Sequence, residues 1–261
     1  MKRSSTLVAI LTLSLILASA ASHAGYVTIS GDQFYCDGNL YKLKGSCYYP
    51  QDDMWAAMWN VDVLPTVARD ADRMRTVGIN SVRIMIPYSN GGWNGPNVPE
   101  EKLQLLEGIV NTFGTRGIRS CVTLFDWETS FPAAGTSTET NHITYLNAIV
   151  DRLKDNPYVI MWDVKNEPDH PSNIGGYDDW DYNPTARNKI VSWLSRMCSA
   201  VKARDSIHPV TCGLRWYNNV ADVVSFEDVA CFHSYWSSTI SGTQIPTVKN
   251  AMGSNQKPIV V

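Results

Sequence analysis

The chain has 261 residues and a formal net charge of −3 at pH 7, from 22 lysine and arginine residues against 25 aspartate and glutamate residues. This near-neutral balance, without a basic run, argues against a nucleic-acid partner. The 44% hydrophobic and 10% aromatic content predicts a globular protein and excludes a disordered one.

Residues 1–24 have the pattern of a secretory signal peptide. A short basic start precedes an apolar run at 7–18 that is too short to span a bilayer comfortably. Ser22-His23-Ala24 places small residues at positions −3 and −1 of a cleavage site. We therefore expect a secreted, extracellular protein with one domain at 25–261 and no membrane association after cleavage. An uncleaved membrane anchor is the alternative.

Strand and helix patterns alternate along the rest of the chain. The segment 26–50 alternates in polarity and contains Asp37-Gly38-Asn39, which predicts a β-hairpin. Helices are then predicted at 65–76, 99–117, 142–157, 183–205 and 245–253. Strands are predicted to begin at Leu43, Ile79, Ile118, Tyr158, Pro209, Val229 and Pro258.

This alternation predicts an α/β fold with a parallel sheet and crossover helices. The strands are apolar almost throughout and carry polar or aromatic residues at their C-terminal ends, as in a TIM (β/α)8-type barrel. With about seven β/α units, the barrel is expected to be incomplete. A doubly wound open sheet is the alternative, but it normally offers a Gly-rich phosphate turn, and "GSCYYP" at 45–50 is not one.

Six cysteines are present, without a CxxC pair or zinc-ligand spacing, so neither a metal nor a cofactor is expected. Cys36 and Cys47 lie on either side of the predicted hairpin end and are the favoured disulfide pair. Cys121, Cys212 and Cys231 lie in apolar runs, where a buried thiol is at least as good an interpretation as a bridge.

The segment "VIMWDVKNEPD" at 159–169 changes from a buried strand to a polar cluster within a few residues. Glu167 stands where the strand ends, beside Asn166 and before Pro168, which cannot continue a strand ladder. A carboxylate at a barrel mouth can have a raised pKa and donate a proton near neutral pH. Asn166 can hold a substrate hydroxyl. A solvated loop glutamate is the alternative.

Three further side chains are predicted to face the same mouth. His233 and Tyr235 are two residues apart on a strand, so they point to the same side, where we expect them to bind a nucleophilic carboxylate and a sugar hydroxyl. Arg83, inside "SVRIMIP", needs an anionic partner if it is buried, and a catalytic carboxylate is the expected one. A satisfied core histidine and an outward-facing arginine are the alternatives.

Aromatic residues follow several strands and suit the apolar faces of sugar rings. Trp127 and Trp236 are the candidates for substrate binding, whereas Trp162 is expected in the core. Trp55 and Trp59 either line an outer subsite or cover the barrel rim. Asp126, beside Trp127, is either a supporting ligand or a loop cap.

The segments "GINSVRIMIP", "WDVKNEPD" and "FHSYW" together resemble the retaining glycoside hydrolases built on TIM barrels, above all glycoside hydrolase family 5, the cellulase and mannanase group. The resemblance implies that Glu167 is the acid/base and that Asn166 contacts the hydroxyl next to the scissile bond. It implies that Arg83, His233 and Tyr235 support the nucleophile and the reacting sugar. The implied substrate is a β-1,4-linked polysaccharide, and a monomer is expected.

Two features depart from that family. Many members carry a histidine where this chain has Asp126-Trp127, which leaves the choice between mannan and glucan open. The family nucleophile is a glutamate just past the seventh strand, whereas "KPIVV" here ends at Val261. Because retention needs two carboxylates roughly 5 Å apart, we expect a C-terminally truncated chain that is inactive alone, with its nucleophile beyond Val261.

Other classes remain as alternatives. A non-catalytic carbohydrate-binding barrel would keep the aromatic cleft without the chemistry. An aldolase would need a Schiff-base lysine, and Lys165, the one lysine near a strand end, is expected to point away from Glu167. A metal-dependent hydrolase would need a His/Asp ligand set, which the sequence does not offer.

Overall fold

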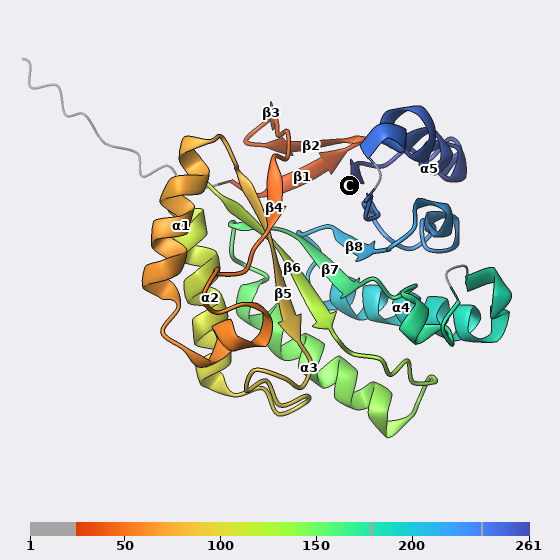
Figure 1. The fold of residues 1–261 in the computed structure, drawn as a ribbon, viewed down its shortest axis with the longest axis horizontal. Helices are drawn as coiled ribbons and strands as arrows, with labels where there is room; N and C mark the ends of the chain where they lie inside the picture. The colour runs from red at the N-terminus through yellow and green to blue at the C-terminus, as the bar shows by residue number, and fades with distance from the viewer. Residues whose placement is uncertain (1–24, 178–179, 236) are drawn as a thin grey trace, which may run out of the picture.

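The computed structural model describes residues 25–177, 180–235 and 237–261, so the predicted signal peptide lies outside the described residues. Helices and strands alternate along this part of the chain (Figure 1). The parallel strands are β4 (Gly45–Cys47), β5 (Ser81–Pro87), β6 (Arg119–Asp126), β7 (Val159–Asn166), β8 (Val210–Gly213), β9 (Ala230–Cys231) and β10 (Ile259–Val260). The α-helices are α1 (Leu64–Thr76), α2 (Glu100–Gly114), α3 (Ser137–Leu153), α4 (Pro184–Arg204) and α5 (Ile245–Met252).

The parallel strands follow one another in space in the order of the sequence. Strands β4 to β8 form one sheet, a bridge between Leu214 and Phe232 joins it to the β9 segment, and β9 pairs with β10. This order without reversal confirms the incomplete barrel, whereas a doubly wound sheet would reverse at a switch point. Within the described residues no ladder joins β10 to β4, and a cavity of about 530 Å³ lies between them inside the barrel.

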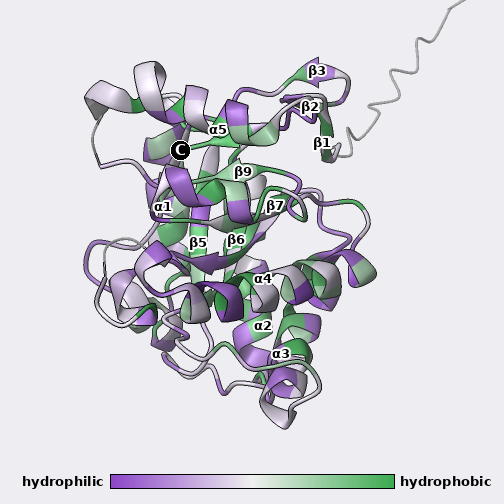
Figure 2. Ribbon diagram, turned by 90° about the vertical axis from the view of Figure 1, so that its right-hand side faces the viewer, coloured by the Kyte–Doolittle hydropathy of each residue, from purple (hydrophilic) through white to green (hydrophobic). Residues whose placement is uncertain are grey.

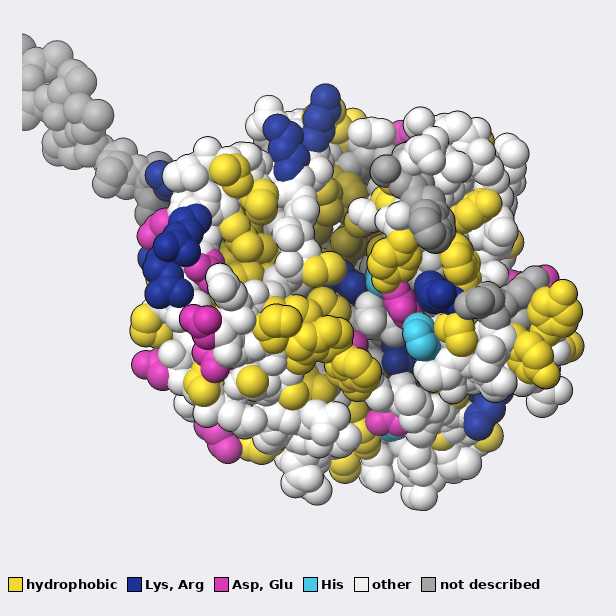
Figure 3. Space-filling model, in the orientation of Figure 1, with side chains coloured by type: hydrophobic (Ala, Val, Ile, Leu, Met, Phe, Trp, Pro, Cys, Tyr) yellow, Lys and Arg dark blue, Asp and Glu magenta, His cyan; other side chains and the backbone are white. Residues whose placement is uncertain are grey.

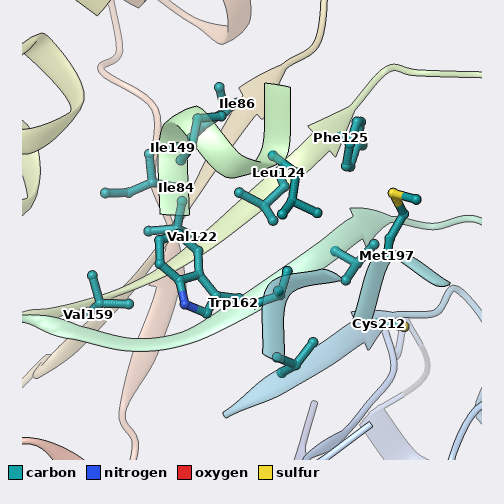
Figure 4. Packing of buried hydrophobic residues seen from close by; sticks show 14 of the residues in the cluster. Ile84, Ile86, Val122, Leu124, Phe125, Ile149, Val159, Trp162, Met197 and Cys212 are labelled. Carbon is teal, nitrogen blue, oxygen red and sulfur yellow. The ribbon is translucent and has the colours of Figure 1, made fainter. Parts of the chain in front are cut away.

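On the central strands, one set of alternate residues faces the helices. Ile84, Val122 and Trp162 lie in the apolar layer between the strands and the helices, where Figure 4 also shows Ile149 of α3 and Met197 of α4. Colouring by hydropathy shows the same apolar character along β5, β6 and β7 (Figure 2). Trp162 is fully buried, which confirms its predicted place in the core.

The start of α3 was predicted too late. The helix begins at Ser137, because the Thr136 side chain accepts a hydrogen bond from the backbone N–H of Glu139. Thr136-x-x-Glu139 has the spacing of a capping box, so the sequence held the signal. Among the described residues, none of the helices has the length and apolar content needed to cross a bilayer.

The N-terminal hairpin is part of a three-stranded antiparallel sheet, β1 (Val27–Ser30), β2 (Gln33–Cys36) and β3 (Asn39–Leu40). Asp37 and Gly38 both have positive φ, 51° and 76°, as a two-residue type I′ turn requires. Val27 and Phe34 of this sheet pack against Ile160 near the start of β7. The sheet therefore covers the N-terminal end of the barrel, opposite the predicted active face.

The predicted disulfide between Cys36 and Cys47 is wrong, because the two free thiols lie at opposite ends of the barrel. Cys36 lies at the covered end, where Arg119 Nη2 donates to its Sγ over 3.1 Å. Cys47 is the last residue of β4 and lines the opposite end of the barrel. Nearness in the sequence misled the prediction, because β4 carries the chain from one end of the barrel to the other.

Candidate active site

The C-terminal ends of the barrel strands surround a cleft of about 590 Å³. Its lining includes Tyr49, Trp55, Arg83, Asp126, Trp127, Glu128, Lys165, Asn166, Glu167, His170, His233 and Tyr235. In Figure 3 this side is hollowed near the middle, with hydrophobic side chains along one wall and acidic, basic and histidine side chains gathered across from them. The cleft thus brings together the predicted site residues of the described chain, whereas Trp236 lies outside the described residues.

The backbone holds Glu167 in an unusual conformation. Its φ of 44° is in the left-handed region, which costs a residue with a side chain on the order of 1–3 kcal/mol. Its N–H donates to Gly213 O over 2.7 Å, and its carbonyl accepts from His170 N over 3.0 Å. Hydrogen bonds to β8 and to the following loop therefore fix the carboxylate at the cleft.

The Glu167 carboxylate accepts two hydrogen bonds on one oxygen. His233 Nδ1 lies 2.7 Å and the Tyr235 hydroxyl 2.8 Å from Glu167 Oε1. Burial alone would raise the pKa of Glu167, but the bonds from His233 and Tyr235 and the nearby histidine charges lower it to about 2. The predicted raised pKa is therefore wrong for this arrangement, because His233 and Tyr235 bind Glu167 itself rather than a second carboxylate.

Arg83 also has a different partner from the one predicted. Its Nε donates to Asp163 Oδ2 over 3.0 Å, and Nη1 donates to Asn166 Oδ1 over 3.0 Å. Asp163 is fully buried and also accepts from Thr123 Oγ1 and from the backbone N–H of Gly213. Arg83 thus neutralises a structural aspartate and orients the Asn166 amide, and its support of the nucleophile stays a prediction.

The role of Asp163 was missed, although the sequence contained a signal for it. It lies inside an apolar strand, and Arg83 lies inside another. Two opposite charges buried in strands of one barrel must find each other or stay unpaired at high cost. Pairing them would have required the strand register, which periodicity alone does not give.

Lys165 lines the cleft, so the expectation that it points away from the side of Glu167 is wrong. Residues two apart on a strand share a face. The Lys165 Nζ donates to Phe125 O over 3.2 Å, and the side chain is 3% exposed. Burial lowers the pKa of this amine to about 8, although Asp126 and other nearby carboxylates oppose the shift.

Asp126 ends β6 and lies in the cleft wall, 3.5 Å from the Tyr49 hydroxyl. Burial raises the pKa of its carboxyl, against the opposing charges of Lys165 and Arg83. Asp126 therefore lies in the cleft at the point where its strand passes into a loop, and the choice between a supporting ligand and a loop cap stays a prediction.

Three aromatic rings form a row along the cleft, the aromatic stack, in which Tyr49 and Trp55 are nearly parallel and Trp127 is tilted by 50° against Trp55. Tyr49 stacks on Trp55 with ring centroids 5.4 Å apart, and Trp55 lies 5.0 Å from Trp127. The side chains of Trp55 and Trp127 are 46% and 59% exposed, and both residues have positive φ. Trp59 instead is buried against Trp93, so of the two alternatives it covers the rim whereas Trp55 lines the cleft.

Within the residues that the structure describes, no group of three or more histidine, cysteine, aspartate or glutamate side chains is arranged to hold a metal ion.

Comparison with known proteins assigns this chain to a family. Residues 35–258 match the family model described as cellulase (glycosyl hydrolase family 5), which confirms the resemblance read from the motifs. The probable mannan endo-1,4-beta-mannosidase C of Aspergillus terreus is 25% identical over 96% of this chain and 76% of its own length. The beta-glucuronidase of Chlorocebus aethiops is 26% identical over 81% of this chain but only 28% of its own length.

A solved structure shares the fold. The endo-1,4-beta-mannanase from Rhizomucor miehei aligns with a TM-score of 0.66 at 17% sequence identity, over 90% of this chain and 80% of that one. At this identity the match supports the barrel architecture, whereas the family itself follows from the family model.

Proposed function

Because the chain belongs to the cellulase family, glycoside hydrolase family 5, we propose that it forms the barrel of a secreted endo-glycanase, an enzyme that cleaves β-1,4-linked mannan or glucan with retention. The observation that carries the proposal is Glu167 at the end of β7, in one cleft with His233, Tyr235 and the aromatic stack. Such a cleft offers a carboxylate for acid–base chemistry and ring faces for sugars. The names of the Aspergillus and Rhizomucor proteins favour mannan.

In the proposed mechanism Glu167 is the acid/base. It gives its proton to the glycosidic oxygen as a second carboxylate attacks the anomeric carbon, and it then takes a proton from the water that releases the sugar. A second carboxylate near Tyr235 would raise the pKa of Glu167 by like-charge repulsion and compete for the tyrosine hydroxyl. Asn166, oriented by Arg83, would donate to the hydroxyl beside the scissile bond.

The second carboxylate has no convincing candidate among the described residues that line the cleft. Asp126 is buried with a raised pKa, and Glu128 Oε1 accepts from Ser130 N over 2.7 Å. Asp126 ends β6 and Glu128 follows it; because β6 lies beside β7, neither carboxylate approaches from across the cleft. We therefore propose that the 261 residues alone bind β-glycans without cleaving them.

The decisive experiment is an assay for reducing ends with soluble mannan, β-glucan and xylan. The 261-residue chain should give no turnover, and measurable turnover would overturn the proposed lack of a nucleophile. Sequencing the gene past the Val261 codon gives the second arm: a glutamate codon within a few positions supports the hydrolase. In a chain that hydrolyses these glycans, Glu167→Gln should remove most of the activity, and an unchanged rate would reject Glu167 as the acid/base.

A non-catalytic carbohydrate binder is the second candidate, and the lowered pKa of Glu167 favours it because an ionised carboxylate cannot donate a proton. A stop codon directly after Val261, together with glycan binding, would support this candidate.

The proposed export is tested separately. N-terminal sequencing of the secreted protein should begin at Gly25, and a start at Met1 would contradict the proposed signal peptide.

A further inference from the structure

Two cysteine side chains touch between α4 and β8. The Sγ atoms of Cys198 and Cys212 lie 3.6 Å apart, and the side chains are 1% and 0% exposed. Figure 4 shows Cys212 on β8 in the layer that also receives Met197, the neighbour of Cys198 on α4. All six cysteines of the chain lie within the described residues and are free thiols in this structure.

We propose that Cys198 and Cys212 form a disulfide when the protein folds in an oxidising environment. Each thiol loses a proton, and the two electrons pass to a small-molecule disulfide such as oxidised glutathione, which becomes two thiols. An S–S bond of about 2.05 Å requires the sulfurs to approach by about 1.5 Å. Side-chain rotation supplies such a movement, because the two sulfurs already face each other across the helix–strand contact.

The timing of the reaction follows from burial. The contact with Cys198 and burial raise the pKa of the Cys212 thiol well above its ordinary value. Because the thiolate is the attacking species, exchange is slow once both sulfurs are enclosed. The bond therefore forms before α4 packs fully on β8, and the finished core then protects it from reductants.

The bond would strengthen the strand beneath the active site. Gly213 follows Cys212 directly, its carbonyl accepts from Glu167 N, and its N–H donates to Asp163 Oδ1 over 2.8 Å. A crosslink from α4 to β8 fixes this strand from its outer side. Closing a loop of about 15 residues should raise the melting temperature by roughly 5–10 °C.

The test uses the 261-residue chain refolded either in reduced glutathione or in a glutathione redox buffer. Both samples are denatured, alkylated with iodoacetamide and mapped by mass spectrometry. After oxidation, two of the six cysteines should resist alkylation and appear in one crosslinked peptide pair containing Cys198 and Cys212. Six alkylated thiols, or a crosslink between other cysteines, would overturn the proposal.

Variants give the second arm of the test. Cys198→Ser and Cys212→Ser should each abolish the crosslink and the gain in melting temperature. Cys121→Ser, which alters another buried cysteine, should keep both. Peptide mapping of the unaltered chain decides the question even where a serine variant fails to fold, and no readout depends on the proposed hydrolysis.

Discussion

At the scale of single residues, the ionisation of Glu167 depends on two donors. Because the Tyr235 hydroxyl donates to Glu167 Oε1 over 2.8 Å, Tyr235→Phe should raise the pKa of Glu167 from about 2 by about one pKa unit. A hydrogen bond to a charged group contributes roughly 1.5–3 kcal/mol, and the exposure of Tyr235 reduces this effect.

Carboxyl ¹³C NMR titration, with Glu167→Gln to assign the signal, measures this change. Tyr26→Phe is the control, because the Tyr26 hydroxyl donates to Asp155 O and not to the site. The same pKa in Tyr235→Phe and the unaltered protein would mean that Tyr235 does not control Glu167.

A second residue-scale prediction concerns the aromatic stack. Trp55→Ala should weaken binding of a soluble β-1,4-mannan oligosaccharide by about tenfold, since a lost aromatic contact costs on the order of 1.4 kcal/mol. The melting temperature should change little, because Trp55 is 46% exposed. Leu40→Ala, equally exposed at 47% but on the N-terminal sheet, is the matched control in titration calorimetry. Equal affinities of the two variants would remove Trp55 from the binding surface.

At the scale of elements, the Arg83–Asp163 pair ties β5 to β7. Asp163→Asn would leave the Arg83 charge buried without its anionic partner, so it should destabilise the protein by about 3–5 kcal/mol. Asp72→Asn breaks an ion pair with Arg116 in which Asp72 is 64% exposed, and it should cost less than about 1 kcal/mol. Denaturant unfolding followed by tryptophan fluorescence measures the free energy of unfolding of both variants. Similar losses in Asp163→Asn and Asp72→Asn would show that the buried pair has no special role.

The elements also show how far sequence reasoning reaches. The apolar pattern of the sequence located the barrel strands, because a parallel strand that is covered on both faces carries apolar residues almost throughout. It could not locate the partner of Arg83, because that depends on the register between strands distant in the sequence. Nor could it give the pKa of Glu167: the same His233 and Tyr235 that marked the site lower this pKa by binding Glu167 directly.

At the scale of the whole molecule, two buried groups limit stability from opposite sides of the pH range. Burial lowers the pKa of His142 to about 4 despite the nearby Glu139 carboxylate. The folded protein thus binds this proton less tightly than the unfolded chain, whose histidine pKa is about 6.5. Stability should fall as the pH drops from about 6.5 to 4, by on the order of 3 kcal/mol from this group.

Glu227 changes the stability with pH in the direction opposite to His142. Burial raises the pKa of its carboxyl well above 4.5, although Lys257 opposes the shift while Asp163 and Asp228 add to it. The folded state therefore holds this proton more tightly than the unfolded state. The contribution of Glu227 to the free energy of unfolding is complete below about pH 4.5 and is lost as the pH rises through the pKa of the folded state.

Glu227→Gln should remove this loss of stability at high pH, because the amide resembles the protonated carboxyl. In the unaltered protein Cys212 N donates to Glu227 Oε2 over 3.1 Å, and the amide oxygen of the variant can still accept this hydrogen bond. The variant should melt at a higher temperature than the unaltered protein at pH 8, with the difference shrinking towards pH 4. Glu101→Gln, an exposed position on α2, should show no such pH-dependent gain. Scanning calorimetry from pH 4 to 8 measures both. A lower melting temperature of Glu227→Gln at pH 8 would mean that the ionised carboxylate stabilises the fold, against the direction set by its burial.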